Sequence, residues 1–240
     1  MLVEVCANSL ESALNAQKAG ADRIELCSEL AVGGITPSYG LLQKVKELIT
    51  IPVHVLIRPR SGDFSYSNFE FEIMKRNIQL CSDLGFDGVV SGILKTDFTL
   101  DIDRTEALMH LARGLHFTFH RAFDWVKDPL RALHELEGLG VDTILSSGQQ
   151  KSAILGIDLL TELSEKSSSC TLMPGSGITS DNVCLFKEKG FRAVHLSGTQ
   201  FHKTLSEAPK VSMNSGSLLK DDSLAVTQVQ SIRTVVEKVK

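Results

Sequence analysis

Short apolar runs alternate with longer amphipathic runs along the whole chain, and this alternation restricts the possible folds more than any other feature. Eight short runs have the length and composition of β-strands, and a run with helical periodicity follows each one. The expected strands lie at 2–6, 23–27, 53–58, 88–92, 116–120, 143–147, 171–174 and 193–197. The expected helices lie at about 9–19, 38–49, 69–84, 103–113, 129–139, 152–166, 180–189 and 223–238. Strands that alternate with helices in this way form parallel β-α-β units.

Eight such units in 240 residues predict a single (β/α)8 barrel, the TIM barrel, over residues 1–240. A doubly wound open sheet is the alternative. No glycine-rich dinucleotide turn follows the first strand, which argues against that alternative and against a nucleotide cofactor. Residues 202–222 show no clear period, so we expect a long loop before the C-terminal helix, either folded over one end of the barrel or mobile.

Composition narrows the range of partners and compartments. The formal net charge is −4 at pH 7 and no basic block occurs, so we expect neither nucleic acid nor a membrane as a partner. The N-terminus enters a strand without a signal pattern, and no apolar run reaches about 18 residues, which predicts a cytoplasmic protein. The five cysteines are scattered and form no CxxC pair, so neither a zinc ribbon nor a disulfide framework is indicated.

The first two strands end alike, in Glu4-Val5-Cys6 and Glu25-Leu26-Cys27. Side chains alternate between the two faces of a strand, so each glutamate shares a face with the cysteine two residues later. Functional groups of such barrels lie at the C-terminal strand ends. We therefore expect two carboxylates and two thiols to meet at one mouth of the barrel.

Other strand ends carry further polar groups, and the alternation places Glu4, Glu25, Arg58, His120 and His195 inside the barrel. One interpretation is a structural ion-pair network with Arg58 between the two glutamates. The other is a catalytic pocket for a small anionic substrate that carries phosphate or carboxylate. In that pocket Arg58 would clamp the anion, and His120 and a glutamate would transfer protons.

Loops beyond the strand ends offer candidate substrate-binding groups. Those after the expected sixth to eighth strands are rich in glycine and serine, which suits an anion held by backbone N–H groups, although such glycines also simply make turns. The candidates are Arg60, Arg121, Asp124, Ser147, Gly148, Gly175, Gly177, Ser197 and Gly198. No strand interior carries lysine, which argues against a Schiff-base enzyme.

Cys6 and Cys27 are the candidate metal ligands. Free cysteine often only packs in a core. Two neighbouring thiolates, however, form a soft site that selects Cu(I) over hard cations. A disulfide is possible, but a reducing cytoplasm disfavours it. The glutamates and histidines of the same mouth would instead suit a harder divalent metal.

Several segments resemble the CutC copper homeostasis family. They are Glu4-Val5-Cys6, 21–27, 33–38, 51–64, 119–124, 144–148 and 173–175, and the resemblance extends over nearly the whole chain. The resemblance implies a (β/α)8 barrel, a cytoplasmic and homo-oligomeric protein, and copper bound by cysteines that match Cys6 and Cys27. Two positions depart from the family pattern: Ser176 replaces a glycine, and Ser91 stands where an aromatic residue is usual. A positive φ at 176 would strain the serine.

Overall fold

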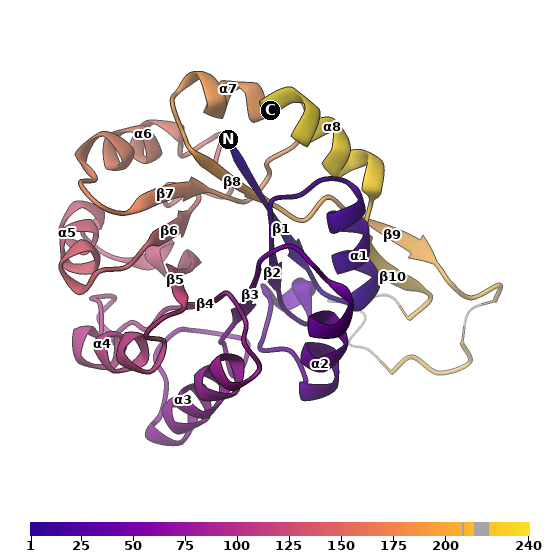
Figure 1. Ribbon diagram of the computed structural model, residues 1–240, viewed down its shortest axis with the longest axis horizontal. Helices are drawn as coiled ribbons and strands as arrows, with labels where there is room; N and C mark the ends of the chain where they lie inside the picture. The colour runs from indigo at the N-terminus through magenta and orange to yellow at the C-terminus, as the bar shows by residue number, and fades with distance from the viewer. Residues whose placement is uncertain (208, 214–220) are drawn as a thin grey trace.

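Eight parallel strands form a ring surrounded by helices in the computed structural model (Figure 1). The structure describes residues 1–207, 209–213 and 221–240. The strands of the ring are β1 (Leu2–Ala7), β2 (Arg23–Leu26), β3 (Val53–Leu56), β4 (Gly88–Ser91), β5 (His116–Phe119), β6 (Thr143–Ser146), β7 (Thr171–Pro174) and β8 (Ala193–Leu196). They pair in the order β7-β6-β5-β4-β3-β2-β1-β8, and a bridge between Gly175 and His195 joins β7 to β8. The predicted (β/α)8 barrel is confirmed.

The helices alternate with these strands along the chain. They are α1 (Leu10–Lys18), α2 (Tyr39–Leu48), α3 (Asn68–Asp83), α4 (Ile102–Leu111), α5 (Pro129–Leu139), α6 (Ile157–Lys166), α7 (Val183–Glu188) and α8 (Val229–Val239). Two short 3-10 helices, η1 (Leu30–Val32) and η2 (Arg121–Trp125), follow β2 and β5. Local sequence explains the helix starts: α3 has a capping box between Ser67 and Glu70, and α5 begins with proline after Asp128.

One turn chemistry recurs at the N-terminal end of the barrel. Asp22 accepts a hydrogen bond from the Val3 backbone N–H, and Asp142 accepts one from the Phe117 N–H, each at 2.8 Å. Asp87 holds the start of β3 in the same way. Each aspartate thus joins the turn before one strand to the start of the preceding strand, which sets the stagger of neighbouring strands.

The main hydrophobic core lies between the ring and the helices, and a different set of residues fills the ring itself. Two small apolar clusters stand apart from the main core, one of Cys6, Cys27, Leu56 and Val90 and one of Leu145, Met173 and Ala193. Each of these residues lies an even number of positions from the other inward-facing residues of its strand, as an inward face requires. Buried polar side chains occupy much of the remaining interior, including Glu4, Arg23, Glu25 and His54.

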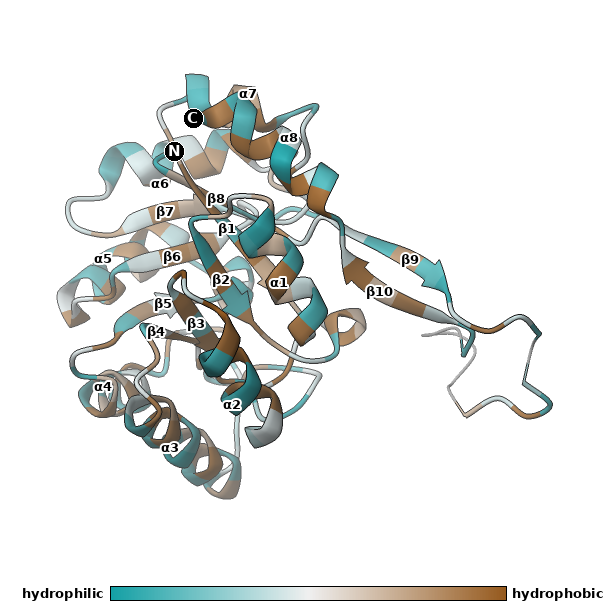
Figure 2. Cartoon of the chain, turned by 45° about the vertical axis from the view of Figure 1, so that its right-hand side comes forward, coloured by the Kyte–Doolittle hydropathy of each residue, from teal (hydrophilic) through white to brown (hydrophobic). Residues whose placement is uncertain are grey.

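The segment before the last helix differs from the prediction. Strands β9 (Thr199–Lys203) and β10 (Ser223–Thr227) form an antiparallel hairpin that extends away from the barrel (Figure 2). The predicted cover over a barrel end is therefore wrong for these two strands, and positions 208 and 214–220 of that segment lie outside the described residues.

The last helix begins at Val229 rather than 223, because residues 223–227 pair with β9, and Ala225 lies opposite Phe201. The helices α6 and α7 also begin later than predicted, at Ile157 and Val183. Before α6, the N–H groups of Leu155 and Gly156 bond to the Ser152 carbonyl in a separate turn.

Candidate functional site

Polar side chains of β1, β2 and β8 meet inside the barrel. Glu4 lies opposite Arg23 on one side and His195 on the other, and Cys6 lies opposite Glu25. The Arg23 guanidinium also reaches Met173 of β7, with Nη2 3.8 Å from the sulfur. Because β2 and β7 are not neighbours in the sheet, these two side chains can meet only through the interior. The inward register predicted for this end of the barrel therefore holds.

A buried ion-pair network centres on Glu4, which has no solvent-exposed surface. One carboxylate oxygen accepts from Arg23 Nε, and the other accepts from His195 Nδ1 at 2.8 Å. Burial alone would raise the pKa of Glu4, but the hydrogen bond from His195 and the charges of Arg23 and His195 lower it to about 2. Burial opposes protonation of His195, yet the Glu25 and Glu4 carboxyls raise its pKa above the usual value. Glu4 is thus an anion held between two cationic groups.

Arg58 does not lie between the two glutamates, so that interpretation is wrong. Arg23 forms the ion pair with Glu4 instead, and sequence analysis missed it although Arg23 precedes Glu25 by two residues and must share its face. The guanidinium of Arg58 instead donates to the backbone carbonyls of Val32, Gly34 and Gly62 at 2.8, 2.8 and 2.9 Å. The loop after β2 thereby gains an anchor on β3.

Two cysteines, a carboxyl group and an imidazole form a cluster beside this network, called here the thiol centre (Cys6, Cys27, Glu25 and His195). The two sulfurs are 3.5 Å apart, and Cys6 Sγ also lies 3.5 Å from Glu25 Oε1. Ligand atoms of Cys6, Glu25 and His195 all lie within 4.8 Å of one another. The structure therefore brings together both predicted metal ligands and two of the predicted catalytic residues.

The surroundings of Cys6 disfavour its thiolate form. The pKa of Cys6 is raised well above its ordinary value by its hydrogen bond with Cys27, by burial and by the nearby Glu25. Burial also raises the pKa of Glu25, whose Oε2 atom has no hydrogen-bond partner among the described residues. A cation bound here would find donor atoms of Cys6, Glu25 and His195 already close together, with the Cys27 sulfur beside that of Cys6.

A pair of histidines lies deeper in the barrel, and sequence analysis missed both. The rings of His54 and His116 have centroids 4.7 Å apart, and His116 Nε2 is 2.9 Å from Thr143 Oγ1. Burial, with help from the Arg23 charge, lowers the pKa of His54 to about 3, so its ring is neutral. The signal was available, because His54 shares a face with Arg58 and His116 shares one with His120.

His120 ends β5 with one ring nitrogen engaged. Its Nδ1 accepts a hydrogen bond from the Ala122 N–H at 3.2 Å, and its Nε2 is buried without a partner in the described structure. Burial and the nearby Arg58 charge lower the pKa of His120 to about 3. The ring is therefore a neutral imidazole whose hydrogen sits on Nε2.

Most of the candidate substrate-binding side chains bond to one another or to nearby protein groups. Arg60 pairs with Glu70 and Asp63. Asp124 accepts from Arg121 Nε at 2.8 Å and from Ser147 Oγ at 2.9 Å.

The remaining candidates hold the turns after β6, β7 and β8. Gly148 donates its N–H to Ser146 Oγ, the Ser197 carbonyl accepts from Thr227 Oγ1 at 3.0 Å, and a Cβ on Gly175 would lie 2.5 Å from Leu145. Gly177 and Gly198 have positive φ. Ser176, which replaces a glycine of the family pattern, also has a positive φ of 76°, a backbone conformation that strains a serine. These contacts give the residues a structural role in the turns. Anion binding by the same loops stays a prediction.

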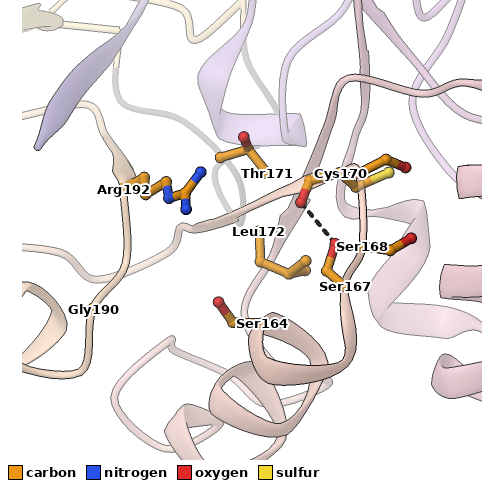
Figure 3. Close-up of a pocket in the computed structure, with 9 residues that line it drawn as sticks. Ser164, Ser167, Ser168, Cys170, Thr171, Leu172, Gly190 and Arg192 are labelled. Atoms are coloured by element: carbon orange, nitrogen blue, oxygen red, sulfur yellow. Dashed lines mark hydrogen bonds between the residues drawn. The ribbon is translucent and has the colours of Figure 1, made fainter.

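A pocket of about 310 Å³ lies at the opposite, N-terminal end of the barrel (Figure 3). Serines of the α6–β7 connection line it together with Thr171, at the start of β7, and Arg192, which precedes β8. None of the predicted site residues lines this pocket. In barrels of this kind the N-terminal face serves stability rather than chemistry.

The fold and the cluster define a class: (β/α)8-barrel proteins with a buried thiol, carboxyl and imidazole centre at the strand ends. The chain belongs to the CutC family, whose model matches residues 1–200. A CutC protein of Proteus mirabilis is 46% identical over 205 residues, 85% of this chain and 82% of the relative.

A solved structure from Streptococcus agalactiae, described provisionally as the copper homeostasis protein CutC, matches with a TM-score of 0.78. It has 34% identity and covers 82% of this chain and 98% of its own. The 3-hexulose-6-phosphate synthase of Salmonella typhimurium, with 16% identity and a TM-score of 0.59 over 100% of this chain and 98% of its own, shares the fold alone. Among the described residues, no helix has the length and apolar character needed to cross a bilayer.

Proposed function

We propose that this protein binds Cu(I) at the thiol centre and acts in copper homeostasis in the cytoplasm. The observation that carries the proposal is the 3.5 Å separation of the Cys6 and Cys27 sulfurs, with Glu25 and His195 within reach. Family membership and the provisional description of the streptococcal relative support the same role.

The chemistry of the donor set fits a soft cation. Two thiolates and an imidazole favour Cu(I), whereas hard cations such as Mg²⁺ and Ca²⁺ prefer sites built from oxygen. The ordered ion pair of Glu4 with His195 orients the imidazole, as carboxylate partners commonly do for metal-binding histidines.

Proton release would accompany binding, because a metal-bound cysteine is a thiolate, whereas the Cys6 thiol has a raised pKa and donates to Glu25 Oε1 in the free protein. Apparent Cu(I) affinity should therefore rise with pH over the neutral range. Glu25 Oε1 accepts the Cys6 S–H, so it is placed to receive the departing proton.

The test is a titration of the reduced protein with Cu(I) against a chromophoric competitor without oxygen. The double variant Cys6→Ser, Cys27→Ser should lose at least about a hundredfold in affinity, which corresponds to roughly 2.7 kcal/mol. Cys184→Ser is the matched control, because Cys184 is an exposed cysteine on α7 away from the barrel interior. Equal affinity in the double variant and the control would overturn the assignment.

One observation favours a second candidate function, an enzyme for a small anionic substrate. Five buried polar atoms of inward-facing residues have no partner among the described residues: Glu25 Oε2, His54 Nδ1, Arg58 Nε, Thr118 Oγ1 and His120 Nε2. Unpaired buried polar groups are costly and are retained where a ligand satisfies them. Screening phosphate- and carboxylate-bearing metabolites for turnover by the metal-free protein, with Glu25→Gln as the inactive reference, tests this candidate.

A further inference from the structure

We infer that Arg58, His120 and Tyr66 form a binding site for a small oxyanion, separate from the thiol centre. The inference gives the second candidate function a place for its anionic substrate. Anion binding can be measured in the absence of any reaction, so the oxyanion site and the enzymatic function are tested separately. The oxyanion site does not depend on copper binding.

Arg58 is a buried cation that lacks an anionic partner. Its side chain is almost wholly buried, with the residue 5% exposed. Its two terminal nitrogens donate only to neutral backbone carbonyls, and no carboxylate of the described residues forms an ion pair with it. By contrast, the other guanidinium that enters the barrel, Arg23, is neutralised by Glu4. A buried charge without a counter-charge is costly, and a bound anion would remove that cost.

Unused donors lie on Arg58 and on two side chains around it. Arg58 Nε, His120 Nε2 and the Tyr66 hydroxyl are all buried and have no hydrogen-bond partner in the described structure. Because His120 Nδ1 accepts from the Ala122 N–H, the Nε2 atom carries the hydrogen and can only donate. Three free donors and no free carboxylate suit an oxyanion and repel a metal cation.

The strand register brings Arg58 and His120 to the same level of the barrel. Leu56 pairs with Val90, and Val90 pairs with Thr118, so the residues two positions further on share a level and a face. Those residues are Arg58, Gly92 and His120. The His120 ring packs directly against Gly92, where a Cβ would lie 2.7 Å from the ring, so glycine at this position lets the ring lie at the level of Arg58.

Phe64 packs against both Arg58 and His120. Its ring lies 5.1 Å from the Arg58 guanidinium carbon and has its centroid 4.9 Å from that of His120. Tyr66 follows two residues later in the same loop, and its hydroxyl lies within the field of the Arg58 charge. Since the carbonyls of Gly34 and Gly62 already fix the guanidinium, an anion would meet a preformed donor set.

The test titrates the metal-free, reduced protein with inorganic phosphate and, separately, with acetate, against chloride at equal ionic strength. Binding is followed through the arginine 1H–15Nε resonances, with Arg58 assigned from its loss in Arg58→Gln. We expect a saturable shift of the Arg58 resonance and a rise in the melting temperature. A stronger response to phosphate identifies a phosphate-bearing ligand, and a stronger response to acetate identifies a carboxylate.

Variants separate the site from general charge effects. Arg58→Gln should weaken binding at least about tenfold, and His120→Gln and Tyr66→Phe about threefold each. Arg131→Gln is the control for loss of a positive charge, since Arg131 lies on the exposed surface of α5, where it pairs with Glu135. Should Arg58→Gln fail to fold, the resonance shift of the unaltered protein and the Tyr66→Phe variant still decide the matter.

Two results would overturn the inference: no saturable binding of either anion up to about 10 mM, or equal weakening by Arg58→Gln and Arg131→Gln. The Cys6→Ser, Cys27→Ser double variant should keep the anion affinity. Failure of the copper proposal would therefore leave this site intact. Binding without turnover would remove only the second candidate function.

Discussion

The ion pair between Glu4 and Arg23 offers the sharpest test of how the barrel interior is held together. Glu4 is fully buried, and its two oxygens have Arg23 and His195 as partners. Arg23→Met keeps an unbranched side chain of similar reach but leaves the carboxylate with His195 alone. Breaking a buried pair from one side typically costs about 3–5 kcal/mol, because the remaining charge stays buried. We expect a loss of that size in the free energy of unfolding at pH 7.

A double-mutant cycle isolates the pair from the packing change. Glu4→Gln removes the charge that Arg23 compensates, so the double variant Glu4→Gln, Arg23→Met should be more stable than the sum of the single effects predicts. We expect a coupling energy of about 2 kcal/mol or more, measured by urea denaturation. Arg131→Met serves as the control, since Arg131 pairs with Glu135 on the exposed surface of α5, and its midpoint should not move. Single effects that add to within about 0.5 kcal/mol would refute the network.

Three further predictions concern individual residues. His54 has a pKa of about 3 in the folded protein and 6.5 as a model compound. Between these two pH values the unfolded state binds more protons than the folded state. The free energy of unfolding therefore falls by about 1 kcal/mol for each pH unit of acidification. His54→Gln should flatten this acid limb in denaturation curves measured from pH 7 to 4, and an unchanged slope would show that His54 is not buried neutral. Gly92→Ala should lower the free energy of unfolding by about 1–3 kcal/mol in urea denaturation, because the added Cβ would lie 2.7 Å from the His120 ring. An unchanged free energy of unfolding would show that the His120 ring does not pack against Gly92. Ser176→Gly should raise stability by roughly 0.5–1 kcal/mol, since its φ of 76° strains a serine, and a thermal melt that shows a loss would contradict this.

Strand periodicity was enough to predict the barrel and the approach of Cys6 to Cys27. Both follow from local alternation and from the parallel pairing of β1 with β2. The same rule would have found Arg23 and His54, had every inward position been read rather than only the strand ends.

Other features depend on contacts between distant parts of the chain. Arg58 does face inward, but its long side chain turns to carbonyls that the β2–α2 loop presents, and nothing local to β3 encodes that loop's path. The residues of β10 are predicted as the start of the last helix, because Ala225 fits the helical spacing of Val229 and Ile232. Their strand conformation comes from pairing with β9, about twenty residues earlier in the chain.

The most direct test of the central claim is X-ray absorption at the copper K-edge on the Cu(I)-loaded, reduced protein. We predict two sulfur neighbours per copper, with loss of sulfur scattering in the Cys6→Ser, Cys27→Ser variant. A spectrum fitted only by nitrogen and oxygen neighbours would contradict the assignment.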